Sequence, residues 1–284
     1  MSIKRVGIVG SGIMGSGMAE VAAKAGFEVV LRSRAQATAD AMVASLEKSL
    51  TKQVERGKLS EEDRTAVLGR VRAVSDLGEL ADCDLVIESI VEDLDTKKQL
   101  FTDLDRVCKD GAIIATNTST LPVVEMAMNT GRPEKVCGIH FFNPAPAMAL
   151  VEVVAAITSS DETIAAATEF ATACGKKPVL VKDQAGFIVN ALLFPYLNNA
   201  VRLLDGGVAT RDDIDTAMKG GCNFPMGPLE LLDLVGLDTS LSILEALYAE
   251  FKDPNYAPAP LLRRMVSAER LGRKTGNGFY DYRK

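Results

Sequence analysis

The stretch VGIVGSGIMGSGMAEVAAKAGFEVVLRSR, residues 6–34, decides the fold. Its apolar run at 6–9 predicts a strand, and the glycine-rich turn at 10–15 leads into a helical pattern that stops at Gly26. A second strand, Phe27 to Leu31, completes a strand–turn–helix–strand unit of about 30 residues. Because all four parts are in register, the unit favours a dinucleotide-binding fold over an ordinary tight turn.

The turn itself is the predicted phosphate site. Small residues let the backbone approach a pyrophosphate, and the N–H groups that open the next helix meet its negative charge. The predicted contacts are Gly10, Ser11, Gly12, Ile13, Met14 and Gly15.

The end of the second strand selects the nicotinamide cofactor. An acid there accepts hydrogen bonds from the adenosine 2′-hydroxyl of NAD(H), whereas an arginine pairs with the 2′-phosphate of NADP(H). The sequence has Arg32, Ser33 and Arg34 at this place. We therefore predict that NADP(H) is favoured, and we keep NAD(H), with both arginines solvated at the surface, as the alternative.

The rest of the chain predicts an α/β fold with a Rossmann-type, doubly wound, mostly parallel sheet and a second, all-helical C-terminal domain. Further strands are expected at 85–89, 112–116, 136–141, 150–154 and 178–181, and a polar helical excursion at about 36–70, with Ser60 as an N-cap. From residue 187 the chain reads as helices punctuated by Gly and Pro. The predicted domains are 1–184, which binds the dinucleotide, and 185–284.

Composition narrows the function classes. The chain has 284 residues and is 47% hydrophobic. Its formal charge of −6 gives no indication that it binds a nucleic acid or an anionic membrane. Five widely spaced cysteines without a C-x-x-C pair predict reduced, buried thiols and no metal site. No signal or membrane-spanning segment is expected, which indicates a cytoplasmic protein.

His140 is the only histidine in the chain, and it ends a predicted strand in the segment GIHFFNP. Hydride transfer at a carbinol carbon needs a group that exchanges the hydroxyl proton, and imidazole titrates nearest neutrality. Glu152 interrupts the apolar run LVEVV and would orient the ring, although a salt bridge at a sheet edge is an alternative. Asn117 and Ser119 follow a strand, and Asn190 interrupts an apolar helix; these could reach the same crevice.

At this point the sequence resembles the 3-hydroxyacyl-CoA dehydrogenase family, and most closely its stand-alone bacterial 3-hydroxybutyryl-CoA dehydrogenases. The resemblance runs from residue 4 to the end and rests on segments such as GSGIMGSGMAE, LVIESIVEDLDTKKQLF, ATNTST, GIHFFNPAPAM, DQAGFIVNALLFPYL, PMGPLELLDLVGLDT and KTGNGFYDY. It implies that His140 is the acid/base and Glu152 its orienting partner, and that Ser119 and Asn190 hold the substrate oxygen.

The resemblance also implies binding residues. Further cofactor contacts fall on Glu92, Lys97, Ser119, Asn143 and Lys274, and we also predict Asn117 as a cofactor contact. Contacts to CoA fall on Ser49 and on Arg56, where a lysine is more usual. The excursion at 36–70 would then be the arm that receives CoA, with Lys52, Arg56 and Lys58 facing its phosphates. The departure from the family is Ser33, where many relatives carry a ribose-binding Asp.

The implied activity interconverts a 3-hydroxyacyl-CoA, by expectation 3-hydroxybutyryl-CoA, and a 3-ketoacyl-CoA such as acetoacetyl-CoA, in fatty-acid and butanoate metabolism. Alternatives are an enzyme for a carrier-protein-tethered or longer acyl chain, and a non-catalytic NAD(P)-binding protein of the same fold. The helical domain, with its apolar segment 187–204, resembles the family's dimerising half, so we expect a homodimer.

Overall fold

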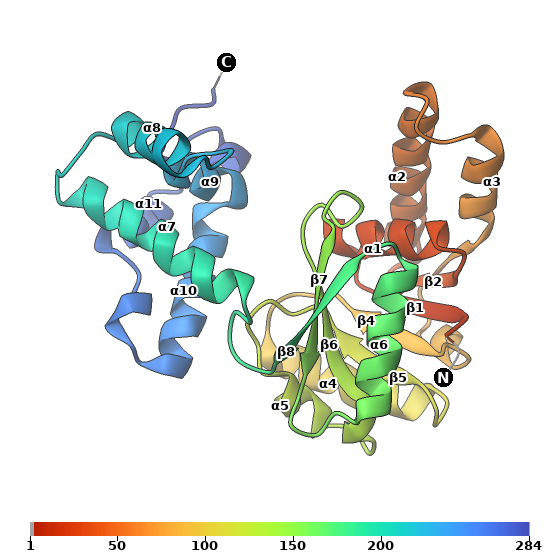
Figure 1. The fold of residues 1–284 in the computed structure, drawn as a ribbon. Coiled ribbons are helices and arrows are strands. Elements are labelled where there is room, and N and C mark those ends of the chain that lie inside the picture. Colours follow the sequence, from red (N-terminus) through yellow and green to blue (C-terminus); the bar gives the residue numbers. More distant parts are fainter. Residues whose placement is uncertain (1–2, 284) are drawn as a thin grey trace. The chain divides into compact units, whose positions relative to one another are not determined.

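The computed structural model describes residues 3–283 and divides them into two compact units (Figure 1). The first unit ends at Asp183 and the second begins at Gln184. Each unit has its own apolar core.

The first unit is built on one eight-stranded sheet in the order β3-β2-β1-β4-β5-β6-β7-β8. All neighbouring strands run parallel except β6 and β7, which pair antiparallel. The strands are β1 (Arg5–Val9), β2 (Glu28–Arg32), β3 (Val71–Val74), β4 (Leu85–Glu88), β5 (Ile113–Thr116), β6 (Val136–Phe141), β7 (Leu150–Ala155) and β8 (Lys177–Lys182). The sheet is therefore doubly wound and mostly parallel, as the sequence predicts.

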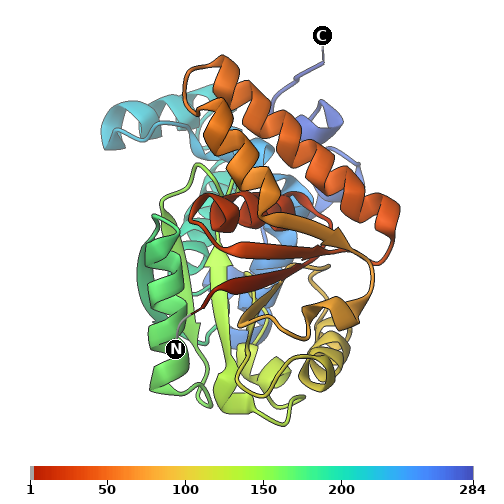
Figure 2. The ribbon, with the colours of Figure 1, turned by 90° about the vertical axis from the view of Figure 1, so that its right-hand side faces the viewer.

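Helices α1 (Ile13–Lys24), α4 (Leu94–Val107), α5 (Val123–Ala127) and α6 (Asp161–Ala173) connect the strands, with short 3-10 turns η1 (Leu77–Leu80) and η2 (Pro133–Lys135). The polar excursion forms α2 (Gln36–Glu55) and α3 (Glu61–Gly69), which lie side by side (Figures 1 and 2). Ser60 caps α3 by accepting a hydrogen bond from the Asp63 N–H.

Alternation along the strands sorts side chains between the two faces of the sheet. Val6 and Ile8 of β1 and Ile139 of β6 join one apolar core with residues of α1 and α6. His140 and Glu152 alternate with residues of that core, so they point to the opposite face. The alternation thus keeps the two polar side chains away from the largest apolar cluster.

Strand β3 is absent from the sequence prediction. Its four residues, VRAV, offer only one fully buried side chain, Val74, and the exposed Arg72 interrupts the run. Such a short edge strand carries too little hydrophobic pattern to be read from the sequence.

The second unit is helical, and no strand occurs among residues 184–283 apart from isolated bridges. Its elements are α7 (Val189–Asp205), α8 (Arg211–Cys222), α9 (Pro228–Val235), α10 (Leu237–Phe251), η3 (Pro254–Tyr256), α11 (Pro260–Ser267) and η4 (Arg273–Thr275). One face of α7 enters this unit's core through Phe194, Leu197 and Val201, while Leu192 on another face is 72% exposed.

Two details concern the chain as a whole. All five cysteines are free, but the prediction that they are buried is wrong for two: Cys174 is half-buried and Cys222, at the end of α8, is exposed. Cys222 lies in the polar turn of a helix, where no apolar neighbour covers it by pattern alone. Among residues 3–283, no helix combines the length and apolar character that a bilayer crossing requires.

Candidate active site

The glycine turn joins β1 to α1 in the conformation that a pyrophosphate site requires. Gly10 has a φ of +137°, and a Cβ there would lie 2.1 Å from the Ser89 carbonyl oxygen, so only glycine fits. A Cβ on Gly12, the N-cap of α1, would meet nothing within 4 Å, and no side chain caps the helix. The start of α1 thus has open space beside its N-cap and no side chain that caps its first N–H groups, which suits an anion.

The turn also fixes the end of β2. The Gly10 N–H donates to the Arg32 carbonyl oxygen at 3.1 Å, and the Ser33 N–H donates to the Val74 carbonyl oxygen. The Arg32 guanidinium donates to the Ser75 carbonyl oxygen at 3.2 Å, and burial, followed by the nearby charge of Arg34, lowers its pKa. Ser33 is buried, while Arg34 is exposed.

His140 and Glu152 meet because of strand register. They are directly opposed partners in the antiparallel β6–β7 pair, and opposed residues project on the same face. His140 Nδ1 lies 2.8 Å from Glu152 Oε2, and both side chains are buried, 4% and 1% exposed. The contact occupies Nδ1, so Nε2 is the ring nitrogen that stays on the side away from Glu152.

Ser119 lies on the Nε2 side of the ring. Its Oγ is 3.3 Å from His140 Nε2, and the side chain is partly exposed. Asn117, two residues earlier, accepts a hydrogen bond from the Phe141 N–H at 2.8 Å, which ties the end of β5 to the end of β6. Three residues of the predicted site, Ser119, His140 and Glu152, thus form a line at the end of the sheet.

Glu92 and Lys97 join this line through the backbone of Ser119. Glu92 accepts hydrogen bonds from the Thr118 hydroxyl at 2.5 Å and from the Ser119 N–H at 2.9 Å. Lys97 lies 3.3 Å from the second oxygen of Glu92 and 2.5 Å from Glu88, which ends β4. The ammonium group is 1% exposed and is held between two carboxylates.

Glu88 was not singled out in the sequence. The signal was present, because Glu88 ends the apolar run LVIE as Glu152 interrupts LVEVV. A carboxylate in such a run needs a partner. The partner of Glu88 is Lys97, which lies near the start of α4.

The predicted CoA arm shows a cluster of solvent-facing cations. Lys52, Arg56 and Lys58 are exposed on the last turn of α2 and just beyond it. Ser49, one turn earlier, donates its hydroxyl to Glu20 at 3.1 Å, and Glu20 also pairs with Lys24. The cations are therefore available to an anion, whereas the Ser49 hydroxyl is engaged inside the unit.

Three other predicted residues are placed as follows. Asn143 is exposed in the loop that joins β6 to β7. Asn190 and Lys274 belong to the second unit, where Asn190 is a buried residue of α7 and Lys274 pairs with Asp238 at 2.5 Å. Within the first unit, contacts link Ser119, His140, Glu152, Glu92 and Lys97, whereas Asn190 and Lys274 lie in the helical unit.

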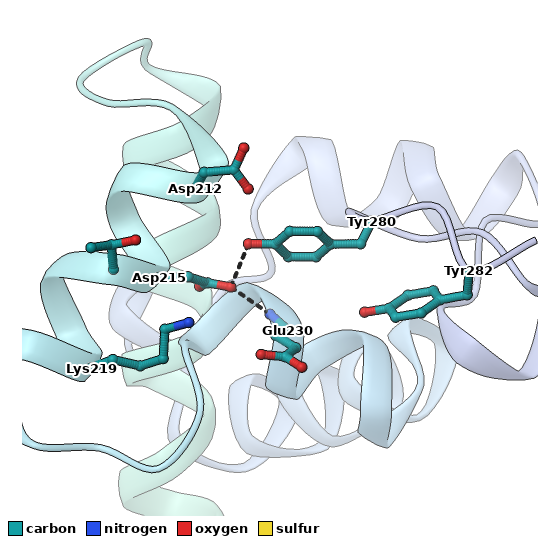
Figure 3. A pocket seen from close by; sticks show the side chains of 7 residues that line it. Asp212, Asp215, Lys219, Glu230, Tyr280 and Tyr282 are labelled. Carbon is teal, nitrogen blue, oxygen red and sulfur yellow. Dashed lines mark hydrogen bonds between the residues drawn. The ribbon is translucent and has the colours of Figure 1, made fainter.

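The helical unit has a polar pocket of its own, of about 280 Å³ (Figure 3). In Figure 3 the Tyr280 hydroxyl points to Asp215, which also accepts from the Glu230 N–H. Asp215 accepts a third hydrogen bond from the Leu229 N–H, so it fastens the start of α9 to the C-terminal segment. These contacts are ones that hold helices together.

The chain matches family descriptions along nearly its whole length. Residues 5–184 match the family described as "3-hydroxyacyl-CoA dehydrogenase, NAD binding domain". Residues 186–282 match "3-hydroxyacyl-CoA dehydrogenase, C-terminal domain".

Individual relatives agree with this. The chain is 47% identical over 283 residues to a 3-hydroxybutyryl-CoA dehydrogenase of Mycobacterium tuberculosis, covering 99% of both proteins. It is 46% identical over 280 residues to one from Clostridioides difficile, covering 99% of this chain and all of the relative. The crystal structure of (S)-3-hydroxybutyryl-CoA dehydrogenase from Ralstonia eutropha superimposes with a TM-score of 0.97 at 43% identity, over the full length of both chains.

Proposed function

The chain belongs to the 3-hydroxyacyl-CoA dehydrogenase family, and on this premise we propose that it interconverts 3-hydroxybutyryl-CoA and acetoacetyl-CoA with a nicotinamide cofactor. The observation that carries the proposal is the hydrogen-bonded line Ser119–His140–Glu152. The imidazole can donate a proton, the carboxylate on Nδ1 orients the ring, and the serine hydroxyl lies beside Nε2. A non-catalytic relative of the same fold would have no need of that arrangement.

The chemistry divides between cofactor and protein. The glycine turn would hold the pyrophosphate of the cofactor, whose nicotinamide would supply or accept the hydride. In the reductive direction, Nε2 of protonated His140 gives a proton to the 3-keto oxygen, and Glu152 stabilises the cationic ring beforehand. The Ser119 hydroxyl donates a hydrogen bond to the same oxygen.

The CoA part of the substrate is assigned to the arm formed by α2 and α3. The exposed ammonium and guanidinium groups of Lys52, Arg56 and Lys58 would pair with the phosphates of CoA in a protein of net charge −6. Replacing Lys52 and Arg56 by Ala should raise the KM for acetoacetyl-CoA and leave kcat nearly unchanged, because these contacts are equal in ground state and transition state.

NADP(H) is the cofactor that the second strand favours. Arg32 and Arg34 flank Ser33, and none of these three positions carries the acid that would bind the ribose of NAD(H). The remaining predicted contacts of the first unit, Glu92, Lys97, Asn117 and Asn143, are assigned to the cofactor as a group.

The direct test measures kcat/KM for NADPH and NADH with acetoacetyl-CoA, following absorbance loss. We expect a higher value for NADPH, and a shift of the ratio toward NADH in Ser33→Asp and in Arg32→Ala. A wild-type enzyme that prefers NADH would contradict the assignment to NADP(H) without touching the assignment of the reaction. If neither NADPH nor NADH were oxidised, the proposed reaction itself would be wrong.

We also propose a homodimer formed by the helical unit. Helices α7 and α8 border an apolar groove of about 490 Å³, lined by Tyr196, Ala200, Leu203, Ile214 and Met218 among others. Beside it, Leu192 and Val208 are 72% and 70% exposed, more apolar surface than a solitary domain needs to show. Light scattering should give twice the chain mass, and Leu203→Glu should lower it.

A further inference from the structure

We infer that Glu88 is a positioning residue for proton transfer, acting on the Ser119–His140 pair through Thr116 and Glu92. The inference rests on the proposed function, because it concerns the same proton-transfer site. It adds a residue that touches neither the substrate oxygen nor the imidazole.

Glu88 is fully buried at the end of β4, and both of its oxygens are occupied. Oε1 accepts from the Ile90 N–H at 2.6 Å and from the Lys97 ammonium at 2.5 Å. Oε2 accepts from the Thr116 hydroxyl at 2.8 Å. All three groups donate, so both oxygens of Glu88 act as acceptors, and the carboxyl group holds three segments of the chain at once.

The contact with Thr116 sets one side of the Ser119 loop. Because the Thr116 hydroxyl donates its proton to Glu88, its lone pairs remain for the Thr118 N–H, which donates to it at 3.0 Å. This hydrogen bond fixes the turn that follows β5 and brings the chain to Ser119. Glu88 thereby determines which way the Thr116 hydroxyl points.

The contact with Lys97 sets the other side. Lys97 is held by Glu88 and lies 3.3 Å from Glu92 Oε2. Glu92 Oε1 in turn accepts from both the Thr118 hydroxyl and the Ser119 N–H. Two branches therefore start at Glu88 and end on the backbone beside Ser119, whose Oγ lies 3.3 Å from His140 Nε2.

Replacing Glu88 by Gln keeps the shape but breaks both branches. The amide has a single acceptor oxygen, so its NH₂ group must take the place of one carboxylate oxygen and face a donor. Lys97 also loses one of its two carboxylate partners. A shift of Ser119 by about 1 Å is enough to lower kcat roughly 100-fold, and we expect a 10- to 100-fold loss.

A double-mutant cycle distinguishes positioning from general destabilisation. If Glu88 acts through Ser119, the double variant Glu88→Gln/Ser119→Ala should be no slower than Ser119→Ala alone. Thr116→Val, which preserves the β-branched shape, cuts the first branch without disturbing the Glu88–Lys97 pair. It should show the same coupling to Ser119→Ala, and it carries the test if Glu88→Gln does not fold.

Asp84 supplies the matched control. It directly precedes β4 at the other end of the strand, and it accepts from the Lys4 N–H, the Arg5 N–H and the Lys109 ammonium, the same kinds of donor that meet Glu88. Asp84→Asn should lower stability while leaving kcat within about twofold, and its small effect should add to that of Ser119→Ala.

The outcomes separate the two levels of the argument. Additive losses in the Glu88 and Thr116 cycles would overturn the positioning role and leave the proposed reaction standing. A normal kcat in Ser119→Ala would instead remove Ser119 from the proposed function, and this inference with it.

Discussion

Buried carboxylates occur in both units of the chain, but their partners differ. In the sheet unit, Glu152 faces an imidazole and Glu88 faces an ammonium. In the helical unit, Asp215 accepts from two backbone N–H groups and the Tyr280 hydroxyl, and Asp233 accepts from the Phe279 and Tyr280 N–H groups and the Tyr282 hydroxyl. The first pair is bonded to groups that can carry charge, and the second to groups that stay neutral.

That difference separates chemistry from assembly. Neutral backbone donors fix a carboxylate in place and leave nothing to relay, so Asp215 and Asp233 serve as fasteners. Their fit is close, since a Cβ on Gly278 would lie 1.9 Å from Asp233 Oδ1 and a Cβ on Gly227 would lie 2.5 Å from Asp215 Oδ1. Removing Glu152 or Glu88 should therefore change the rate, whereas removing Asp215 or Asp233 should change the stability.

The largest effect is expected for His140→Ala. Loss of the proposed acid/base should lower kcat by about 10²- to 10⁴-fold, because no other imidazole exists in the chain to exchange the proton. Cofactor affinity, measured by fluorescence titration, should stay close to that of the wild type, because the glycine turn is untouched. A variant with near-normal kcat would remove His140 from the mechanism.

Glu152→Gln should follow, with a loss of about 100-fold or more. The amide keeps the size of the side chain but can present an N–H to Nδ1, which selects the wrong tautomer of the ring and no longer stabilises its cationic form. Steady-state kcat with acetoacetyl-CoA measures this, and an unchanged melting temperature would show that the loss is chemical. A kcat within twofold of wild type would mean that the His140–Glu152 contact only supports the β6–β7 pair.

Asp215→Asn probes the other side of the comparison. The amide cannot accept from Leu229, Glu230 and Tyr280 together, so the free energy of unfolding should fall by about 1–3 kcal/mol. Urea denaturation measures the loss, and kcat well below the unfolding transition should match the wild type. A rate loss comparable to that of Glu152→Gln in fully folded protein would break the division between the two units.

The sequence predicts the doubly wound sheet, the helical second unit and the glycine turn, because these depend on local pattern. It also predicts the pairing of His140 with Glu152, since both interrupt apolar runs and the loop between them turns the chain back. The contact itself needed the antiparallel register, which places the two residues directly opposite each other. The sequence suggests that pairing but does not contain its distance.

What the sequence could not provide depends on contacts between distant segments. Glu88 shows in the sequence only as a carboxylate at the end of an apolar run, and its partner becomes clear once α4 brings Lys97 to it. Strand β3 has too few residues and too few buried side chains to be predicted from its hydrophobic pattern. The exposure of Cys222 depends on which segments pack against the end of α8. Each of these is a matter of tertiary neighbours rather than of periodicity.

The smallest expected effect concerns the pH dependence of stability in the helical unit. Burial raises the pKa of Asp233 and outweighs the hydrogen bonds from the Tyr280 and Phe279 N–H groups, which act in the opposite direction. In the unfolded chain the same carboxyl titrates near about 3.9. Between these two pKa values the native state binds more protons than the unfolded state, so the contribution of Asp233 to the free energy of unfolding falls as the pH rises.

Asp233→Asn does not titrate and isolates this contribution. The free energy of unfolding of the wild type minus that of the variant should decrease as the pH rises from about 4 through the raised pKa, and should then level off. Urea titrations of both proteins at several pH values measure the difference. A difference that grows with pH would mean that the hydrogen bonds outweigh burial and lower the pKa of Asp233 in the native state.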